Sequence, residues 1–271
     1  MTEPELFTID LDDDERELMV QGLSEYFKSA KSGIPLLVLL FRVSGAEEFQ
    51  ALVWRLLEAV DNKEPLSPFD WSRALLLTEI AWASDLVGSG IEFAKIRSDE
   101  EVMPLLRSIQ YQVVFPGGRS TLLHDNANQV EESSGPNPMT EPELVAIDLT
   151  DEERSLMLQG LNEYGGPVPR EVPLLLAPLL GLSTIDEFWT LQERLIIGIG
   201  AKAPLSDLDW ARAVFLTEIS WASDVIGSGI DFKTSVRDEN AAPLMRSIQR
   251  KVSTHERFVL LRDNARKIAS Q

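Results

Sequence analysis

Hydrophobic residues recur at intervals of three and four between residues 70 and 85, the spacing of one face of an α-helix. The positions on this face are Trp71, Leu75, Thr78 and Trp82. Further apolar residues between them leave little of the surface polar, so the pattern predicts the central, most buried helix of the fold. Ser67 is placed to cap its start, and Gly88-Ser-Gly90 follows as a stop signal.

This stretch occurs twice in the chain. Pro65–Phe93 matches Pro204–Phe232 at 20 of 29 positions. Met1–Tyr26 matches Met139–Tyr164 at 19 of 26 positions. The repeat period of about 138 residues is that of a duplicated domain, because the units of solenoids are much shorter.

The sequence predicts two tandem homologous modules, residues 1–130 and 139–271, joined by a linker at residues 131–138. The linker is rich in Glu, Ser, Gly and Pro, a composition typical of connecting segments. The second module opens with its own methionine, Met139, which indicates that two coding units were joined by gene duplication or fusion.

Each module is predicted to be an all-α bundle of about five or six helices, because no run of alternating residues is long enough for a sheet core. Phe7–Leu11 is short enough to be a strand or simply extended chain. Pro178 interrupts one apolar segment and predicts a kinked or brief helix there. The helices expected in the first module besides the central one are 12–27, 35–43, 46–60, 99–113 and 119–130. Those expected in the second are one that opens at Thr150 with a capping box, and 173–182, 185–199, 238–252 and 257–268.

The chain has 271 residues and a formal net charge of −19. This charge disfavours binding to nucleic acid phosphates and to anionic membranes, and it permits binding to a basic protein. Cysteine is absent, which excludes disulfides and thiolate chemistry. The N-terminus is acidic and lacks an apolar core, so we expect a cytoplasmic protein without a membrane span.

Two aspartates occupy positions that are unfavourable for a negative charge. Asp85 and Asp224 fall in the last turn of the central helices, where the helix dipole disfavours an anion. The simpler interpretation is that each carboxylate accepts backbone N–H groups of the following Gly-Ser-Gly turn, or pairs with an arginine. The functional interpretation is a ligand or partner contact in that turn, which would include Ser89 and Ser228.

Glu79 and its counterpart Glu218 complete the set of candidate binding residues. Glu79 is expected to form an internal charge pair with Arg73 or Arg107 that fixes helix register. The Asp12–Glu15 run is more typical of a helix start than of a cation site. No histidine occurs in both modules, so no catalytic residue, metal site or cofactor is predicted. Four tryptophans are assigned to the structural core: Trp71, Trp82, Trp210 and Trp221.

We therefore expect a non-enzymatic acidic interaction module that sequesters or regulates a basic partner, possible types being an immunity protein or an antitoxin. The alternative is a small-ligand- or metal-binding enzyme that uses the helix carboxylates and the Gly-Ser-Gly turn. The modules are expected to pack as a pseudo-two-fold pair, an intramolecular pseudo-dimer. They differ most between Phe27 and Asn62, with Trp54 and Trp189 at non-equivalent positions. This divergent face is predicted to be the seam, or the place where each module meets a different partner.

Overall fold

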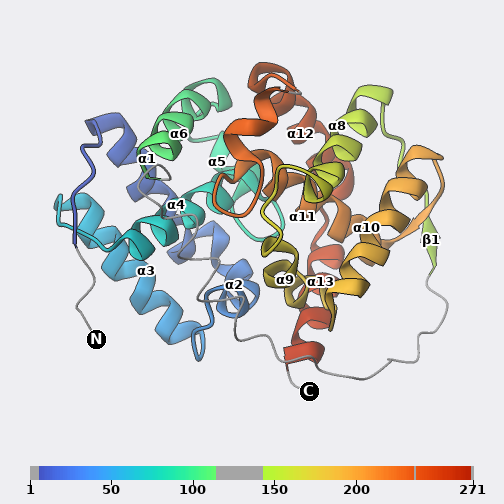
Figure 1. Cartoon of the computed structure of the whole chain (residues 1–271), viewed down its shortest axis with the longest axis horizontal. Coiled ribbons are helices and arrows are strands. Elements are labelled where there is room, and N and C mark those ends of the chain that lie inside the picture. The colour runs from blue at the N-terminus through green and yellow to red at the C-terminus, as the bar shows by residue number, and fades with distance from the viewer. Residues whose placement is uncertain (1–5, 114–142, 235, 270–271) are drawn as a thin grey trace.

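The computed structural model describes residues 6–113, 143–234 and 236–269, and it confirms an all-α fold (Figure 1). Strand structure in these residues is limited to two short pieces. β1 (Leu144–Val145) pairs antiparallel with β2 (Leu205–Ser206), and Phe7 forms an isolated bridge with Leu66. The segment from Phe7 to Leu11 is therefore extended chain with one bridge.

Residues 6–113 form the first half of the described chain. Its elements, with η for a 3-10 helix, are α1 (Asp13–Ser24), η1 (Glu25–Phe27), η2 (Ser29–Gly33), α2 (Ile34–Phe41), α3 (Ala46–Asp61), α4 (Pro68–Ala83), α5 (Gly90–Ala94) and α6 (Asp99–Val113). Residues 143–269 form the second half. Its helices are α8 (Asp151–Asn162), η4 (Glu163–Gly165), α9 (Val172–Leu176), η5 (Pro178–Leu180), α10 (Ile185–Gly200), α11 (Asp207–Ala222), η6 (Gly229–Thr234), α12 (Asp238–Val252) and α13 (His255–Ala269).

The second half repeats the element order of the first, with local differences. Pro178 divides the counterpart of α2 into α9 and η5, as the proline predicts. The predicted last helix of the second half is α13, whereas its counterpart at 119–130 and the linker at 131–138 lie outside the described residues.

The helix starts follow the capping signals in the sequence. Ser67 Oγ accepts a hydrogen bond from Asp70 N at 3.1 Å, and Ser206 caps α11 in the same way. Thr150 forms a capping box with Glu153 at the start of α8. These caps satisfy backbone donors that the first turn of a helix leaves free.

α4 and α11 are the central helices of their halves, as the pattern predicts, and the residues from Ala74 to Ala83 of α4 are all buried. α1 crosses α4 closely at Gly22, where an added Cβ would lie 2.9 Å from Thr78 Cγ2. Gly160 of α8 and Thr217 of α11 make the same contact. The small residue is thus what allows the two helices to approach.

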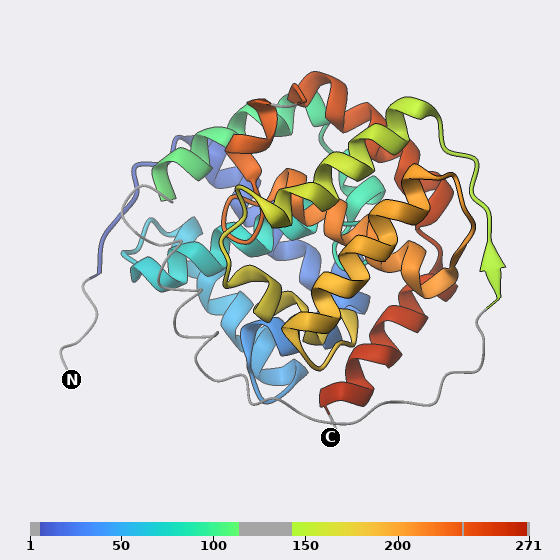
Figure 2. The ribbon, with the colours of Figure 1, turned by 45° about the vertical axis from the view of Figure 1, so that its right-hand side comes forward.

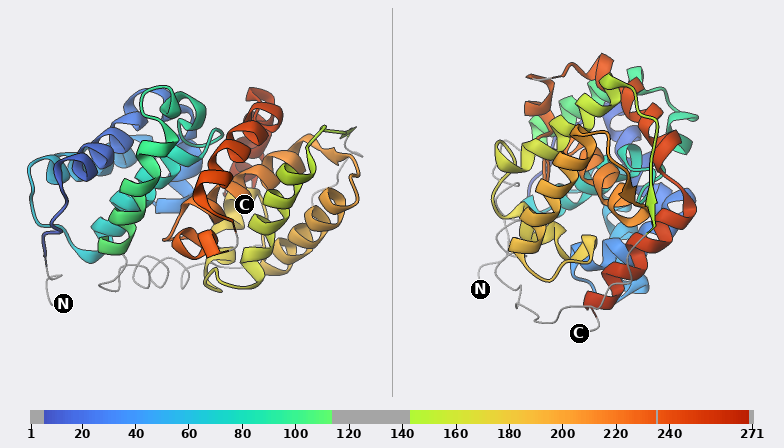
Figure 3. Two further views of the ribbon diagram at one scale, coloured as in Figure 1. Left: turned by 90° about the horizontal axis from the view of Figure 1, so that it is seen from above. Right: turned by 90° about the vertical axis from the view of Figure 1, so that its right-hand side faces the viewer.

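The two halves lie side by side, the first to the left and the second to the right in Figure 1. Seen from above, they meet in the middle of the molecule (Figure 3, left). α4 contacts α11, and α12 contacts α5 and α6. On the outer side of the second half, α8 packs beside α10 (Figure 2).

The divergent stretch between Phe27 and Asn62 forms one part of the seam. From that stretch, α2 contacts η5 and α13 of the second half. The other part of the seam, the α4–α11 and α6–α12 contacts, comes from segments that the two halves share.

Among the described residues, no single helix is long and apolar enough to cross a membrane. The segments Val172–Leu180 and Ile185–Gly200 are long and apolar enough only when taken together, and the chain bends by 77° between them.

Candidate functional site

The candidate carboxylates Glu79 and Glu218 lie where the two halves meet. Both side chains are 0% exposed. Each belongs to the penultimate turn of a central helix, and each reaches across to the end of the other central helix. The site is therefore a buried polar network between the halves.

Glu79 accepts hydrogen bonds from the second half. Ser223 Oγ donates to its Oε2 at 2.6 Å, and Asp224 N donates to its Oε1 at 2.9 Å. Gln110 Nε2, from the same half as Glu79, donates to Oε1 at 2.7 Å and to Ala222 O at 2.8 Å. Gln110 thus links α6, α4 and the end of α11.

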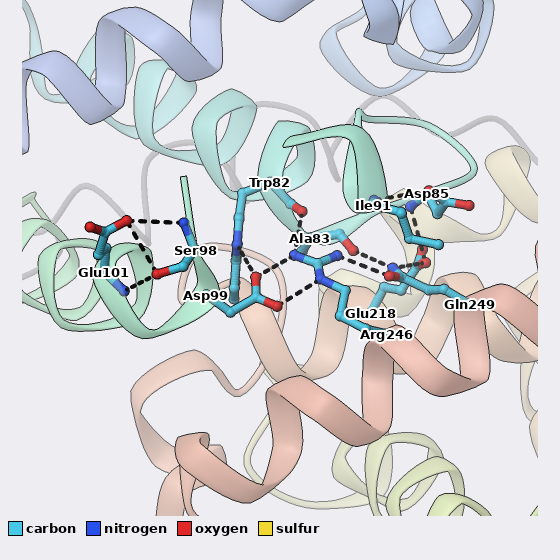
Figure 4. A network of polar contacts seen from close by, with 10 residues as sticks. All are labelled: Trp82, Ala83, Asp85, Ile91, Ser98, Asp99, Glu101, Glu218, Arg246 and Gln249. Carbon is cyan, nitrogen blue, oxygen red and sulfur yellow. Dashed lines mark hydrogen bonds and ion pairs between the residues drawn. The ribbon is translucent and has the colours of Figure 1, made fainter. Parts of the chain in front are cut away.

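Glu218 accepts the matching set from the first half. Ser84 Oγ donates at 2.7 Å and Asp85 N at 3.1 Å. Gln249 Nε2 donates to Glu218 at 2.7 Å and to Ala83 O at 2.6 Å (Figure 4). Each of these bonds is the counterpart of one around Glu79, with the halves exchanged.

Two arginine–aspartate pairs continue the network. Arg246 donates to Asp99 from Nε at 3.0 Å and from a terminal nitrogen at 2.8 Å, and also to Trp82 O at 3.1 Å. Figure 4 shows Asp99 between Arg246 and Trp82, whose indole donates to it at 2.9 Å. Arg107 makes the matching bidentate pair with Asp238, at 3.0 and 2.9 Å. Such bidentate pairs fix geometry as well as charge.

Burial shifts the acidity of the central carboxyls. Desolvation raises the pKa of Glu79 to about 7, although the bonds from Ser223, Asp224 N and Gln110 act in the opposite direction. The pKa of Glu218 is raised to about 7 for the same reasons. These groups therefore titrate in the neutral range.

The expected charge pair of Glu79 with Arg73 or Arg107 is wrong. Arg73 pairs with Asp70 of its own helix at 3.5 Å, and Arg107 pairs with Asp238. Glu79 instead accepts hydrogen bonds from neutral donors, and desolvation, assisted by the nearby charge of Asp224, raises its pKa.

Asp85 and Asp224 hold the turns that follow the central helices. Asp85 Oδ1 accepts from Ile91 N at 3.0 Å, and Asp224 Oδ1 accepts from Ile230 N at 3.1 Å. The donors follow directly after the Gly-Ser-Gly turns. Gly90 has a positive φ of 42°, which favours glycine at that position.

Ser89 and Ser228 anchor the same turns to buried carboxylates. Ser89 Oγ donates to Glu25 at 2.8 Å, and Ser228 Oγ donates to Glu163 at 2.6 Å. Both serines are buried, as are Glu79, Glu218 and Asp224, whereas Asp85 is partly exposed. All six candidate binding residues form hydrogen bonds within the chain.

The four tryptophans are buried in the core. Trp71 and Trp210 donate through Nε1 to Phe7 O and Val145 O, at 3.0 and 2.8 Å. Trp82 and Trp221 face each other across the halves with ring centroids 4.8 Å apart. They form the apolar centre of the network.

Sequence reasoning missed several partners in the network. They are Ser84, Asp99, Gln110 and their counterparts Ser223, Asp238 and Gln249. The recurrence of Arg107-Ser-Ile-Gln110 as Arg246-Ser-Ile-Gln249 was the available signal, because Arg and Gln three apart share one helix face.

A cleft of about 940 Å³ opens beside the arginine–aspartate pairs, between α6 and α12. Its lining includes Met103, Pro104 and Arg107 from α6 and Ala242, Pro243 and Arg246 from α12. In the part of the chain that the structure describes, no three His, Cys, Asp or Glu residues come together as a metal site.

Comparison with known proteins gives no relative. No family model, no curated protein and no solved structure matches this chain.

Proposed function

We propose that the chain is a non-enzymatic acidic interaction protein, a sequestering or regulatory binder of a basic partner such as a toxin, built from two tandem modules. The observation that carries this proposal is a cluster of exposed carboxylates on α1 and α3, described below. The buried candidate residues then serve to hold the two modules together.

The pseudo-two-fold arrangement of the modules is part of the proposal. It is supported by the paired bonds of Glu79 and Glu218, which exchange when the halves are exchanged. It is also supported by the contact of Trp82 with its own counterpart, Trp221, since a residue meets its equivalent only beside a two-fold axis.

The partner surface is assigned to the first module, at a cluster that we name the acidic face. It consists of the exposed residues Asp12, Asp13, Asp14, Glu17, Glu58, Asp61 and Glu64. The start of α1 and the end of α3 are joined by Arg16, which donates to Val60 O at 2.9 Å, and by the Lys63–Asp13 ion pair at 3.7 Å. Asp14 also pairs with Arg97 at 3.8 Å, so the seven acids outnumber the two cations paired with them. An excess of negative charge attracts a basic protein and speeds its association.

The second half lacks this face. The corresponding residues are Thr150, Asp151, Glu152, Ser155, Ile197, Gly200 and Ala203. Residues 1–138 carry 24 acidic and 11 basic residues, net −13, and residues 139–271 carry 20 and 14, net −6. The difference supports a partner that distinguishes the two modules.

The experiment compares two variants of equal charge. One neutralises three acids of the acidic face (Asp13→Asn, Asp14→Asn, Glu58→Gln), and the other neutralises three exposed acids of the second half (Asp151→Asn, Glu152→Gln, Glu193→Gln). Binding of a lysine-rich peptide is measured by titration at low and at high salt. We expect at least about a tenfold loss from the first variant at low salt, and little from the second. Equal losses from both would contradict a dedicated face.

The cleft between α6 and α12 supports a second candidate function, the binding of a small ligand. The alternative that the chain is an enzyme rests on the same cleft. Its lining does not include Glu79, Asp85 or Ser89. A thermal-shift screen against metals and metabolites tests it. A ligand for this cleft should raise the melting temperature of the wild type but not of Met103→Trp, which fills the space.

A further inference from the structure

Two large aromatic side chains form an exposed pair on the first half. Phe27 of η1 is 38% exposed and Trp54 of α3 is 53% exposed. Their rings meet edge to face, with centroids 6.0 Å apart and an interplanar angle of 84°. An edge-to-face pair holds both rings in a defined orientation although neither belongs to the core.

The second half has no such pair at the equivalent positions. Gly165 of η4 stands where Phe27 does, and Glu193 of α10 stands where Trp54 does. The fold therefore does not require aromatic residues there. The pair is a property of the first module alone, like the acidic face.

The aromatic pair and the acidic face lie on one continuous surface. Trp54, Glu58 and Asp61 are spaced by four and three along α3, so they share a helix face. From Trp54 to Asp61 this surface extends ~10 Å along the axis, two helical turns. α1 packs beside α3 and carries Glu17 at its acidic end, while η1 and Phe27 follow its other end. One end of the surface is thus acidic and the other aromatic.

Aromatic side chains that are rigid and surface-exposed are the residues that anchor protein interfaces. A partner gains affinity by covering the rings and gains orientation by pairing its cations with the adjacent acids. Charge complementarity selects a basic partner, and the two-turn length suits a helix with an apolar stripe.

We propose that Phe27 and Trp54 are the apolar anchor for a basic amphipathic helix whose cations face Glu17, Glu58 and Asp61. This inference rests on the proposed function, to which it adds the anchoring residues and the shape of the partner segment. It also gives the difference between the modules a role, because only the first can bind in this way.

The test uses the full chain and a labelled helical peptide with leucine on one side and lysine on the other. Trp54→Glu installs the residue of the second half and adds one negative charge. An anchor predicts at least about tenfold weaker binding of this peptide, whereas attraction by charge alone predicts equal or tighter binding. Ile197→Glu is the matched control, because Ile197 is 62% exposed on the equivalent helix of the second half and the change adds the same charge. It should not weaken binding.

The other outcomes of this experiment decide between the anchor, the proposed function and self-association. If Trp54→Glu binds as well as the wild type, the anchor is overturned and the proposed function stands on charge alone. If the wild type binds neither this peptide nor the lysine-rich peptide at low salt, both the proposed function and the anchor are wrong. If the wild type is a dimer by ultracentrifugation and Trp54→Glu is a monomer, the face pairs with a second copy and the proposal is wrong. Unchanged melting of the variant confirms that the fold is intact.

Discussion

At the scale of single residues, the two central glutamates are unusual because each is fully buried and accepts hydrogen bonds from neutral donors. Burial disfavours the ionised form. Their pKa of about 7 in the folded chain compares with an ordinary value of 4.5. The folded state therefore binds protons that the unfolded state releases between these values.

This difference predicts how stability depends on pH. A carboxyl whose pKa is raised by folding stabilises the fold when protonated, so stability should rise as the pH falls from about 7 toward 4.5. The gain is on the order of 3 kcal/mol for each group. Urea unfolding at a series of pH values measures it.

The double variant Glu79→Gln with Glu218→Gln provides the control. The amides are neutral at every pH and keep an acceptor oxygen, so the slope in this window should largely disappear. A slope that persists unchanged would assign the effect to other groups.

A second prediction at this scale concerns Trp82, which is buried against Trp221 and bonded to Asp99. Trp82→Ala should reduce the free energy of unfolding by about 3–5 kcal/mol. A loss under about 1 kcal/mol in chemical denaturation would contradict its assignment to the core.

At the scale of elements, the close crossing of α1 and α4 depends on one glycine. Gly22→Ala would place its Cβ 3.0 Å from the backbone Cα of Thr78, which cannot move away as a flexible side chain can. We expect a loss of about 1–3 kcal/mol, although alanine favours the helix. Gly165→Ala is the control, since nothing lies within 4 Å of the added Cβ. Thermal melting should separate the two variants.

The sequence predicted these elements to different extents. The central helices were clear, because their apolar period and serine caps agree. The interruption at Pro178 was also predictable, since proline lacks a donor. The part of the seam that the central helices form was not, because the partners of Glu79 lie 144 and 145 residues away in the chain. A local pattern identifies which residues share a face, but not which distant backbone donors meet them.

At the scale of the whole molecule, the arginine–aspartate pairs link the halves independently of the linker. We expect that a chain carrying a protease site between residues 131 and 138 will remain one complex after cleavage, as judged by gel filtration at micromolar concentration. Arg107→Ala with Arg246→Ala should separate the fragments, because removing one partner of a buried pair costs about 3–5 kcal/mol.

Arg55→Ala serves as the comparison. Arg55 also pairs with an aspartate at 2.9 Å, but it is exposed and its partner Asp70 lies in the same half. Separation of the fragments in the cleaved wild type would show that the linker and not the seam keeps the halves together. Separation in the Arg55 variant would show that the effect is not specific to the arginines of the seam.

The reciprocal bonding of Glu79 and Glu218 also bears on concentrated solutions. Each half presents groups that fit the other half, whichever chain supplies it. Two chains could therefore exchange halves without losing a hydrogen bond, as in domain swapping. A short linker is expected to keep the effective concentration of the neighbouring half in the millimolar range, which would favour the closed monomer at ordinary protein concentrations. Lengthening or stiffening the linker would lower that concentration and favour swapped dimers or open chains of molecules.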